Sequence, residues 1–342
     1  MNENLVSQNI VFPVQRSVVL ARENVPPLKP QQVLCRATKS LISIGTESFC
    51  LRGEYDKGTY WEEYIQYPFH SGYSMAAEVI GVGDDVNGWS LGDRVCSLHE
   101  HRQFFVASDK ELFPVPDDIS DVEATWASLG RTTQVGVRRA QLQMGETAVV
   151  IGLGILGQLV VQYLRICGAR RIIVVDTSEE RCKLAIEGGA THMICGSAQA
   201  AREQVGAITN GQWADVVFEI TGHPAVLAPA TQILRKLGRI VLLGDSPTPS
   251  LQALGPRVVG DSLSILGIHG FMYPEHSSPF NPWTAPEMTA LFFDFLRQGR
   301  MNVGRLVSRT VSPAQAEEVY LGLLAAPSKD LGIIFDWEGL GE

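Results

Sequence analysis

The chain has 342 residues, of which 45% are hydrophobic and 19% are charged, proportions typical of a globular protein. Its net charge of −9 at pH 7 argues against nucleic acid or an anionic membrane as a partner, because either would require a basic face. At this length we expect two domains, each large enough for its own core.

The first residues, MNENLVSQNIVFPVQ, lack the basic segment and following apolar segment of a secretory signal. No apolar run approaches the length needed to span a bilayer. The cysteines form no CxxC pair, and several lie in apolar or helical runs: Cys35, Cys50, Cys96, Cys167, Cys182 and Cys195. We therefore expect reduced core thiols in a cytoplasmic protein.

Residues 1–130 consist of short β-like runs broken by glycine and proline, among them QNIVFPV, SVVLA, MAAEVIGVGDDV and RQFFVAS. Their period-2 alternation and dense turn signals predict a mostly antiparallel, barrel-like unit.

From about Glu146 to Ile268 strands alternate with helical runs. The predicted strands are residues 147–151, 171–175, 192–195, 214–219, 239–243 and 262–267. Six strands with intervening helices predict an α/β fold with a doubly wound parallel sheet. One helix, PEMTALFFDFLRQG, and an apolar strand, GIIFDW, follow it. We expect a domain of residues 133–268 inserted into a domain made of residues 1–132 and 269–342.

The most informative stretch joins the first two predicted strands, where the first strand ends in GLGILG, residues 152–157. Gly152 permits the turn, Gly154 lets a pyrophosphate approach the backbone, and Gly157 lets helix and strand pack closely. The following helix N-terminus attracts phosphate. Asp176, 24 residues after Gly152, is placed to bind the ribose hydroxyls and repel a 2′-phosphate. The sequence predicts a dinucleotide site that favours NAD over NADP.

In overall pattern the chain resembles the medium-chain dehydrogenase/reductases. The supporting segments occur in order: GTE at residues 45–47, AAEVIGVGDDVNGWSLGDRV, ASLGRTTQVGV, the glycine fingerprint, WADVVFEITG, LGRIVLLG and VSPAQAEEVYLGLL. The resemblance implies a GroES-like β domain and a Rossmann domain. We expect the cofactor site to include Ile155, Leu156, Thr177, Thr221, Gly244 and His269 as well as the fingerprint residues.

The departures from the family pattern concern metal. At the positions that resemble the catalytic zinc ligands this chain has Ile44, Tyr73 followed by Ser74, and Arg131, none of which binds zinc well. The cysteine-rich lobe that holds a structural zinc is replaced by CSLHEHRQFFV. We interpret His99 and His101 there as solvent-facing polar residues, and we expect no metal.

Without zinc, alcohol oxidation needs another charge stabiliser and proton acceptor. By resemblance Arg131 lies near the old metal position and could hold an oxyanion. Tyr73 beside that cation could have a lowered pKa and act as acid/base, with Thr46 as relay and His70 as the backup base.

Structural roles for the same residues remain open. Arg131 could instead bridge the domains through an ion pair or bind the pyrophosphate. Tyr73 could fill the space left by the metal, Glu47 could hold its loop, and His70 could be a hydrogen-bonded loop residue. His269 could contact the nicotinamide or act as a hinge.

Two segments rich in aromatic and polar residues, 53–74 and 269–287, are predicted to line a cleft. Aromatic faces beside carboxylates suit a polyhydroxylated secondary alcohol or its ketone, although such aromatics also build loop cores. The alternatives are a zinc-free quinone or enoyl reductase, and a non-catalytic dinucleotide sensor. We expect a small-molecule substrate and a homodimer.

Overall fold

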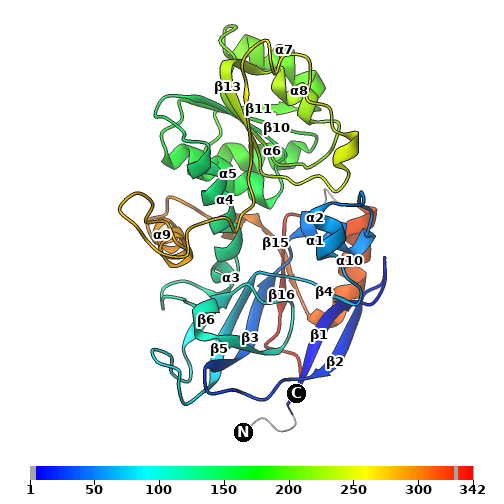
Figure 1. Ribbon diagram of the computed structural model, residues 1–342, viewed down its shortest axis with the longest axis vertical. Coiled ribbons are helices and arrows are strands. Elements are labelled where there is room, and N and C mark those ends of the chain that lie inside the picture. Colours follow the sequence, from blue (N-terminus) through cyan, green and yellow to red (C-terminus); the bar gives the residue numbers. More distant parts are fainter. Residues whose placement is uncertain (1–4, 327–329, 342) are drawn as a thin grey trace.

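The computed structural model describes residues 5–326 and 330–341. Figure 1 shows a lobe built on a parallel sheet, with the remaining strands gathered in a second lobe below it. The N-terminal and C-terminal parts of the chain both enter this second lobe, as expected for a domain inserted into another.

The first lobe contains the predicted six-stranded parallel sheet in the order β11-β10-β9-β12-β13-β14. Its strands are β9 (Thr147–Ile151), β10 (Arg171–Asp176), β11 (His192–Cys195), β12 (Ala214–Glu219), β13 (Leu234–Leu242) and β14 (Ser264–Gly267). The prediction of fold class is confirmed. Strand β13 begins at Leu234, earlier than predicted, because Arg235, Lys236 and Gly238 interrupt the apolar pattern there; its pairing with β12 also shifts register in this part.

Helices cover this sheet: α5 (Ile155–Ile166), α6 (Glu179–Gly188), α7 (Ala198–Ile208) and α8 (Leu227–Thr231). Serine side chains cap two of them, since Ser178 accepts from the Arg181 backbone N–H and Ser197 from that of Ala200. The apolar faces of these helices and the strands form buried clusters on the sheet.

Antiparallel pairing dominates the second lobe, as predicted. A three-stranded sheet contains β2 (Val19–Asn24), β1 (Val6–Phe12) and β4 (Phe69–His70). A second sheet has the order β15 (Val307–Val311), β16 (Gly332–Asp336), β3 (Gln32–Leu41), β5 (Met75–Val82), β6 (Arg94–Ser97) and β8 (Phe113–Pro114), with β7 (Phe104–Ser108) paired to β3. Among the strands that the structure describes in this lobe, β15 and β16 alone pair in parallel. Because β16 pairs with β3, the C-terminal strand completes the sheet begun near the N-terminus.

The remaining helices are α1 (Ile44–Arg52), α2 (Tyr60–Tyr64), α3 (Asp121–Ala124), α4 (Ala127–Arg139), α9 (Ala285–Arg297) and α10 (Ala316–Ala325). Single 3-10 turns occupy Asp109–Glu111, Pro249–Leu251, Gly304–Leu306 and Pro313–Gln315.

Helix α4 connects the two lobes. It contacts α5 of the parallel-sheet lobe and also α9. One buried cluster continues from Leu41 and Phe113 through α4 to Val150 and Phe292, so the lobes share packed core. The domain boundary proposed between residues 132 and 133 falls inside this helix.

All six cysteines are free, but they are not all core residues. Cys35, Cys50, Cys96 and Cys182 are buried, whereas Cys167 and Cys195 are exposed. The core-thiol prediction is wrong for these two, since Cys167 lies at the end of α5 and Cys195 on the edge strand β11. Among the described residues, no helix has both the length and the apolar character needed to cross a membrane.

Candidate active site

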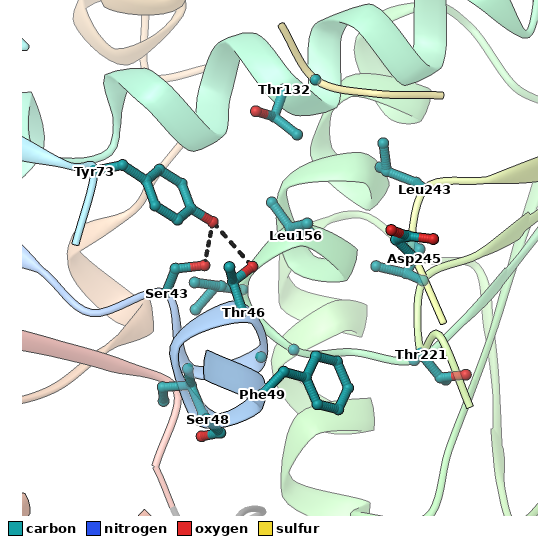
Figure 2. Close-up of a pocket in the computed structure, with 18 of the residues that line it drawn as sticks. Ser43, Thr46, Ser48, Phe49, Tyr73, Thr132, Leu156, Thr221, Leu243 and Asp245 are labelled. Atoms are coloured by element: carbon teal, nitrogen blue, oxygen red, sulfur yellow. Dashed lines mark hydrogen bonds between the residues drawn. The ribbon is translucent and has the colours of Figure 1, made fainter. Parts of the chain in front are cut away.

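A cavity of about 490 Å³ opens at the carboxyl ends of the parallel strands and is closed from the other side by α1 and α2. Ligands of open parallel sheets bind at this edge. The predicted site residues that line it are Thr46, Tyr73, Gly152, Gly154, Ile155, Leu156, Asp176, Thr221, Gly244 and His269. Figure 2 shows part of this lining, with Tyr73, Ser43 and Thr46 grouped on one side.

The glycine fingerprint has the geometry that a dinucleotide requires. Gly152 has φ +92°, and a Cβ there would lie 2.7 Å from Thr221 Cγ2. A Cβ on Gly157 would lie 2.0 Å from the Gly152 carbonyl oxygen, so helix and turn could not pack as they do. A Cβ on Gly154 would meet nothing within 4 Å, which leaves its backbone open to a ligand at the start of α5. The residues present therefore fit a dinucleotide.

Asp176 lies at the end of β10 and lines the cavity. Its Oδ2 accepts from the Leu153 N–H at 2.7 Å and its Oδ1 from the Ser178 N–H at 2.8 Å, which fixes the carboxylate beside the fingerprint. Arg181, which sequence reasoning missed, also lines the cavity. Burial lowers the pKa of its guanidinium, and the nearby Asp176 carboxylate opposes this effect.

Two predicted cofactor residues do not line the cavity. Gly157 acts through the packing described above. The Thr177 carbonyl lies 3.7 Å from the Cys195 thiol that donates to it. Thr221 does line the cavity, and both its N–H and its hydroxyl donate to Glu219 Oε1, which holds the turn after β12. Burial raises the pKa of Glu219.

Three hydroxyl groups meet in the cavity. The Tyr73 hydroxyl lies 2.5 Å from Ser43 Oγ and 3.2 Å from Thr46 Oγ1 (Figure 2). Burial raises the pKa of Tyr73 to about 12, although the hydrogen bonds to Ser43 and Thr46 act in the opposite direction. Tyr73 is therefore a neutral phenol near pH 7. The prediction of a lowered pKa is corrected, because no cation from the described part of the chain acts on this phenol. Ser43 was missed because it precedes the GTE motif.

A buried carboxylate supports the hydroxyl cluster. Glu47 is 1% exposed, and its Oε1 accepts from the Ser43 N–H at 2.7 Å. Its Oε2 accepts from Tyr320 and lies 3.1 Å from His101 Nε2. Glu47 thus fixes the start of α1, where Ser43 and Thr46 face Tyr73. This agrees with the interpretation that Glu47 holds its loop.

Arg131 lies elsewhere. It is 1% exposed, its guanidinium carbon lies 4.3 Å from the centre of the Phe113 ring, and its Nη1 donates to Thr289 Oγ1 at 3.3 Å. The next residue on α4, Thr132, lines the cavity instead. The expected oxyanion role is corrected because the helix directs Arg131 toward α9 and β8. It connects these elements by stacking and a hydroxyl contact; no ion pair of Arg131 occurs within the described ranges.

The histidines have other surroundings than the sequence suggested. His70 Nε2 lies 2.9 Å from Glu23 Oε1, in a second cavity of about 360 Å³ that shares Tyr73 and Phe271 with the first. His101 is 1% exposed and His99 stacks on Phe105 at 4.3 Å. The prediction that His99 and His101 face solvent is wrong, because His101 is buried against Glu47 and His99 packs on the Phe105 ring.

Aromatic side chains from both predicted cleft segments line the cavity. Tyr60, Trp61 and Tyr64 come from the first segment, His269 and Phe271 from the second. The remaining part of the second segment, residues 272–287, lies outside the cavity lining. Asp245, which follows β13, adds a carboxylate that no sequence motif indicated.

The residues around Tyr73 do not form the set of ligands that a catalytic zinc requires. Zinc sites in proteins use thiolate, imidazole or carboxylate groups. Near Tyr73 the polar groups are hydroxyls, and His269 is the single imidazole in the lining. Within residues 5–326 and 330–341 no group of three or more histidine, cysteine, aspartate or glutamate side chains could hold a metal ion.

Comparison with known proteins finds similarity to dehydrogenases. The family of zinc-binding dehydrogenases matches residues 156–284. Sorbitol dehydrogenase of Bacillus subtilis (strain 168) is 27% identical over 257 residues, covering 65% of this chain and 72% of its own. D-guloside 3-dehydrogenase of Escherichia coli (strain K12) is 26% identical over 257 residues, covering 74% of this chain and 73% of its own.

Solved structures show the same fold. A zinc-binding dehydrogenase from Sinorhizobium meliloti 1021 bound to NADP has a TM-score of 0.80 at 19% identity, over 97% of this chain and 99% of that one. A short chain alcohol dehydrogenase from Escherichia coli CFT073 complexed with NADH has a TM-score of 0.79 at 18% identity, with coverage of 97% and 99%.

The fold and the dinucleotide cavity define a two-domain dehydrogenase. The chain is similar to zinc-binding dehydrogenases over residues 156–284 and to polyol dehydrogenases over a longer stretch; it is an alcohol dehydrogenase-like oxidoreductase whose cavity fits a dinucleotide.

Two of the three fingerprint glycines, Gly154 and Gly157, allow a matched pair of substitutions. Gly154→Ala should leave the free energy of unfolding within about 1 kcal/mol of the wild type, because the added methyl meets no atom. It should weaken NADH binding about tenfold or more by obstructing the pyrophosphate. Gly157→Ala should lower the unfolding free energy by about 1–3 kcal/mol through overpacking. Denaturant unfolding and NADH fluorescence titration measure both; wild-type NADH affinity in Gly154→Ala would contradict the assignment.

Proposed function

We propose that the protein is a zinc-independent, NAD(H)-dependent oxidoreductase that interconverts a polyhydroxylated secondary alcohol and its ketone. The observation that carries this proposal is the cluster of Tyr73, Ser43 and Thr46 hydroxyls inside the cofactor cavity, at the place where a metal-dependent enzyme needs zinc ligands. The cluster offers a proton donor and a relay without a Lewis acid.

The bound dinucleotide supplies the hydride acceptor for oxidation and the hydride donor for reduction. In the direction of reduction, the neutral Tyr73 hydroxyl donates its proton to the oxygen of the carbonyl as that oxygen gains negative charge. Thr46 or Ser43 then returns a proton to Tyr73. In the direction of oxidation the proton of the alcohol hydroxyl would pass through the same three hydroxyls to solvent, while a dinucleotide held at the glycine fingerprint would supply the hydride acceptor. Thr46 is only half-buried, which favours it as the outer member.

Asp176 supports NAD rather than NADP as the cofactor. Its carboxylate is fixed by two backbone N–H groups and retains lone pairs for ribose hydroxyls. A 2′-phosphate near it would meet a fixed negative charge. Arg181 lines the same end of the cavity and is the group that could offset this repulsion.

Two kinds of evidence support a polyhydroxylated substrate. The sorbitol and guloside dehydrogenases among the relatives are named for such compounds. The cavity wall formed by Tyr60, Trp61, Tyr64 and Phe271 gives apolar faces against which a sugar or cyclitol ring can pack.

A homodimer in the cytoplasm is the state we propose for the working protein. Strand β14 lies at the edge of the parallel sheet, and large apolar side chains such as Val259, Met272 and Phe280 are exposed. Unpaired sheet edges and exposed apolar groups favour association. The free cysteines agree with a reducing compartment.

Cofactor preference gives a direct test of Asp176. NAD should bind at least tenfold tighter than NADP, a difference of about 1.4 kcal/mol or more in binding free energy. Asp176→Ala should narrow the difference between the NAD and NADP affinities by weakening the binding of NAD. Asp84→Ala, at an exposed turn, should leave this difference unchanged. Calorimetric titration measures both affinities. Equal or tighter binding of NADP by the wild type would refute the NAD assignment and favour the reductase alternative.

Tyr73→Phe should lower kcat about 100-fold, the range for a lost general acid or base, with little change in NADH affinity. Because the Tyr73 pKa is about 12, the ratio of wild-type to variant kcat should stay level from about pH 6 to about pH 9. Tyr55→Phe, outside the cavity lining, serves as the control. Near-normal turnover in Tyr73→Phe, or a ratio that rises steeply with pH, would exclude the neutral-phenol role.

Sedimentation velocity tests the proposed homodimer. The wild type should sediment as a dimer at micromolar concentration, and Ile265→Lys on the edge strand should shift it toward monomer, because a lysine disfavours edge pairing. A wild-type monomer would remove this part of the proposal.

A further inference from the structure

Asp245 holds a position that the proposed hydride and proton steps leave unexplained. It follows Gly244 at the carboxyl end of β13, where a Cβ on Gly244 would lie 2.5 Å from the Gly222 backbone nitrogen. This tight backbone packing fixes where the Asp245 side chain starts. In Figure 2, Asp245 lies across the pocket from Tyr73, Ser43 and Thr46.

The loop that carries Asp245 is tied to the other lobe. The Asp56 N–H donates to the Pro247 carbonyl at 2.8 Å, and the Ser250 N–H donates to Asp56 Oδ2 at 2.8 Å. These bonds hold the segment after Asp245 against the loop that leads into α2. The position of Asp245 in the cavity therefore depends on contacts between the two lobes.

Within the described segments, Asp245 forms no ion pair with a lysine or an arginine. Burial raises the pKa of Asp245, while the nearby Trp61 indole and the proximity of His269 act in the opposite direction.

The two arginines of the cavity lining have other surroundings. The Arg52 guanidinium lies over the Phe49 ring at 4.7 Å. Burial lowers the pKa of this guanidinium, and the Glu54 carboxylate acts in the opposite direction. Arg181 donates to the Asp330 carbonyl at 3.1 Å and lies near Asp176.

The aromatic side chains of Tyr60, Trp61 and His269 lie near the Asp245 carboxylate. The Tyr60 ring centre lies 5.6 Å from that of His269 and 5.4 Å from that of Tyr64. A carboxylate acceptor next to ring faces matches a molecule that presents hydroxyl donors at its edge and C–H groups on its face. The same carboxylate repels a phosphate or carboxylate group on a ligand.

We infer that Asp245 binds hydroxyl groups of the substrate away from the reacting carbon, and that it selects uncharged polyhydroxylated alcohols against phosphorylated or carboxylated ones. This inference rests on the proposed dehydrogenase function and specifies its substrate class. Asp245 contacts substrate, whereas the reaction itself takes place at the hydroxyl cluster opposite.

The test compares matched neutral and anionic polyols with the full-length enzyme. The probes are D-sorbitol with D-sorbitol 6-phosphate, and galactitol with galactitol 1-phosphate; D-glucamine supplies the corresponding cation. Wild type should favour each neutral polyol over its phosphate about tenfold or more, both in kcat/KM and in calorimetric affinity for the NADH-loaded enzyme.

Asp245→Asn should raise KM for the neutral polyols about tenfold with a smaller change in kcat, because it removes a charged hydrogen-bond acceptor. It should also reduce the discrimination against the phosphates. Asp84→Asn is the matched control, and unchanged NADH binding by Asp245→Asn shows that the variant is folded.

Four results would overturn the inference: no binding of either neutral polyol, equal binding of polyol and phosphate, D-glucamine preferred over D-sorbitol about tenfold, or unchanged discrimination in Asp245→Asn. If none of these compounds is oxidised with NAD or NADP, the proposed dehydrogenation of polyols fails. The binding preference and its response to Asp245→Asn still decide the role of this carboxylate.

Discussion

The buried carboxylate of Glu47 is the constraint on which the active site depends. Removing a charge from water is costly unless hydrogen bonds compensate it. Here Glu47 accepts from the Ser43 backbone, from Tyr320 on α10 and from His101. These partners come from three distant parts of the sequence, and satisfying one carboxylate brings them together. The start of α1 is thereby fixed, and with it the hydroxyls of Ser43 and Thr46 that meet Tyr73.

The two lobes contribute different chemistry to one cavity. The parallel-sheet lobe supplies the glycine turn, the helix N-terminus and Asp176, which together fit a dinucleotide. The other lobe supplies neutral hydroxyls and aromatic walls. A hydroxyl cluster provides less electrostatic stabilisation than a divalent cation. In the mechanism we propose, hydrogen-bond donation by the neutral Tyr73 phenol, with positioning by the surrounding rings, takes the part that a metal ion plays in zinc-dependent dehydrogenases.

Sequence reasoning succeeded where a residue acts through its neighbours along the chain. The six parallel strands follow from buried β-branched runs, and the cofactor turn follows from glycine spacing. Sequence reasoning failed where the direction of a side chain, or a partner far away in the sequence, determines the position of a residue. Adjacent residues of α4 point in different directions, so Thr132 reaches the cavity while Arg131 stacks on Phe113. His101 contacts Glu47, which is 54 positions away in the sequence. Asp245 lies after β13 in a segment that carries no recognisable sequence motif.

The central claim is that hydride transfer here uses hydroxyl groups in place of zinc. The most direct measurement is elemental analysis of unchelated, catalytically active enzyme, followed by activity assays with and without a chelator. The account predicts well under one zinc per chain and a kcat that the chelator does not change. One zinc per chain, with activity lost on chelation and restored by zinc, would contradict it.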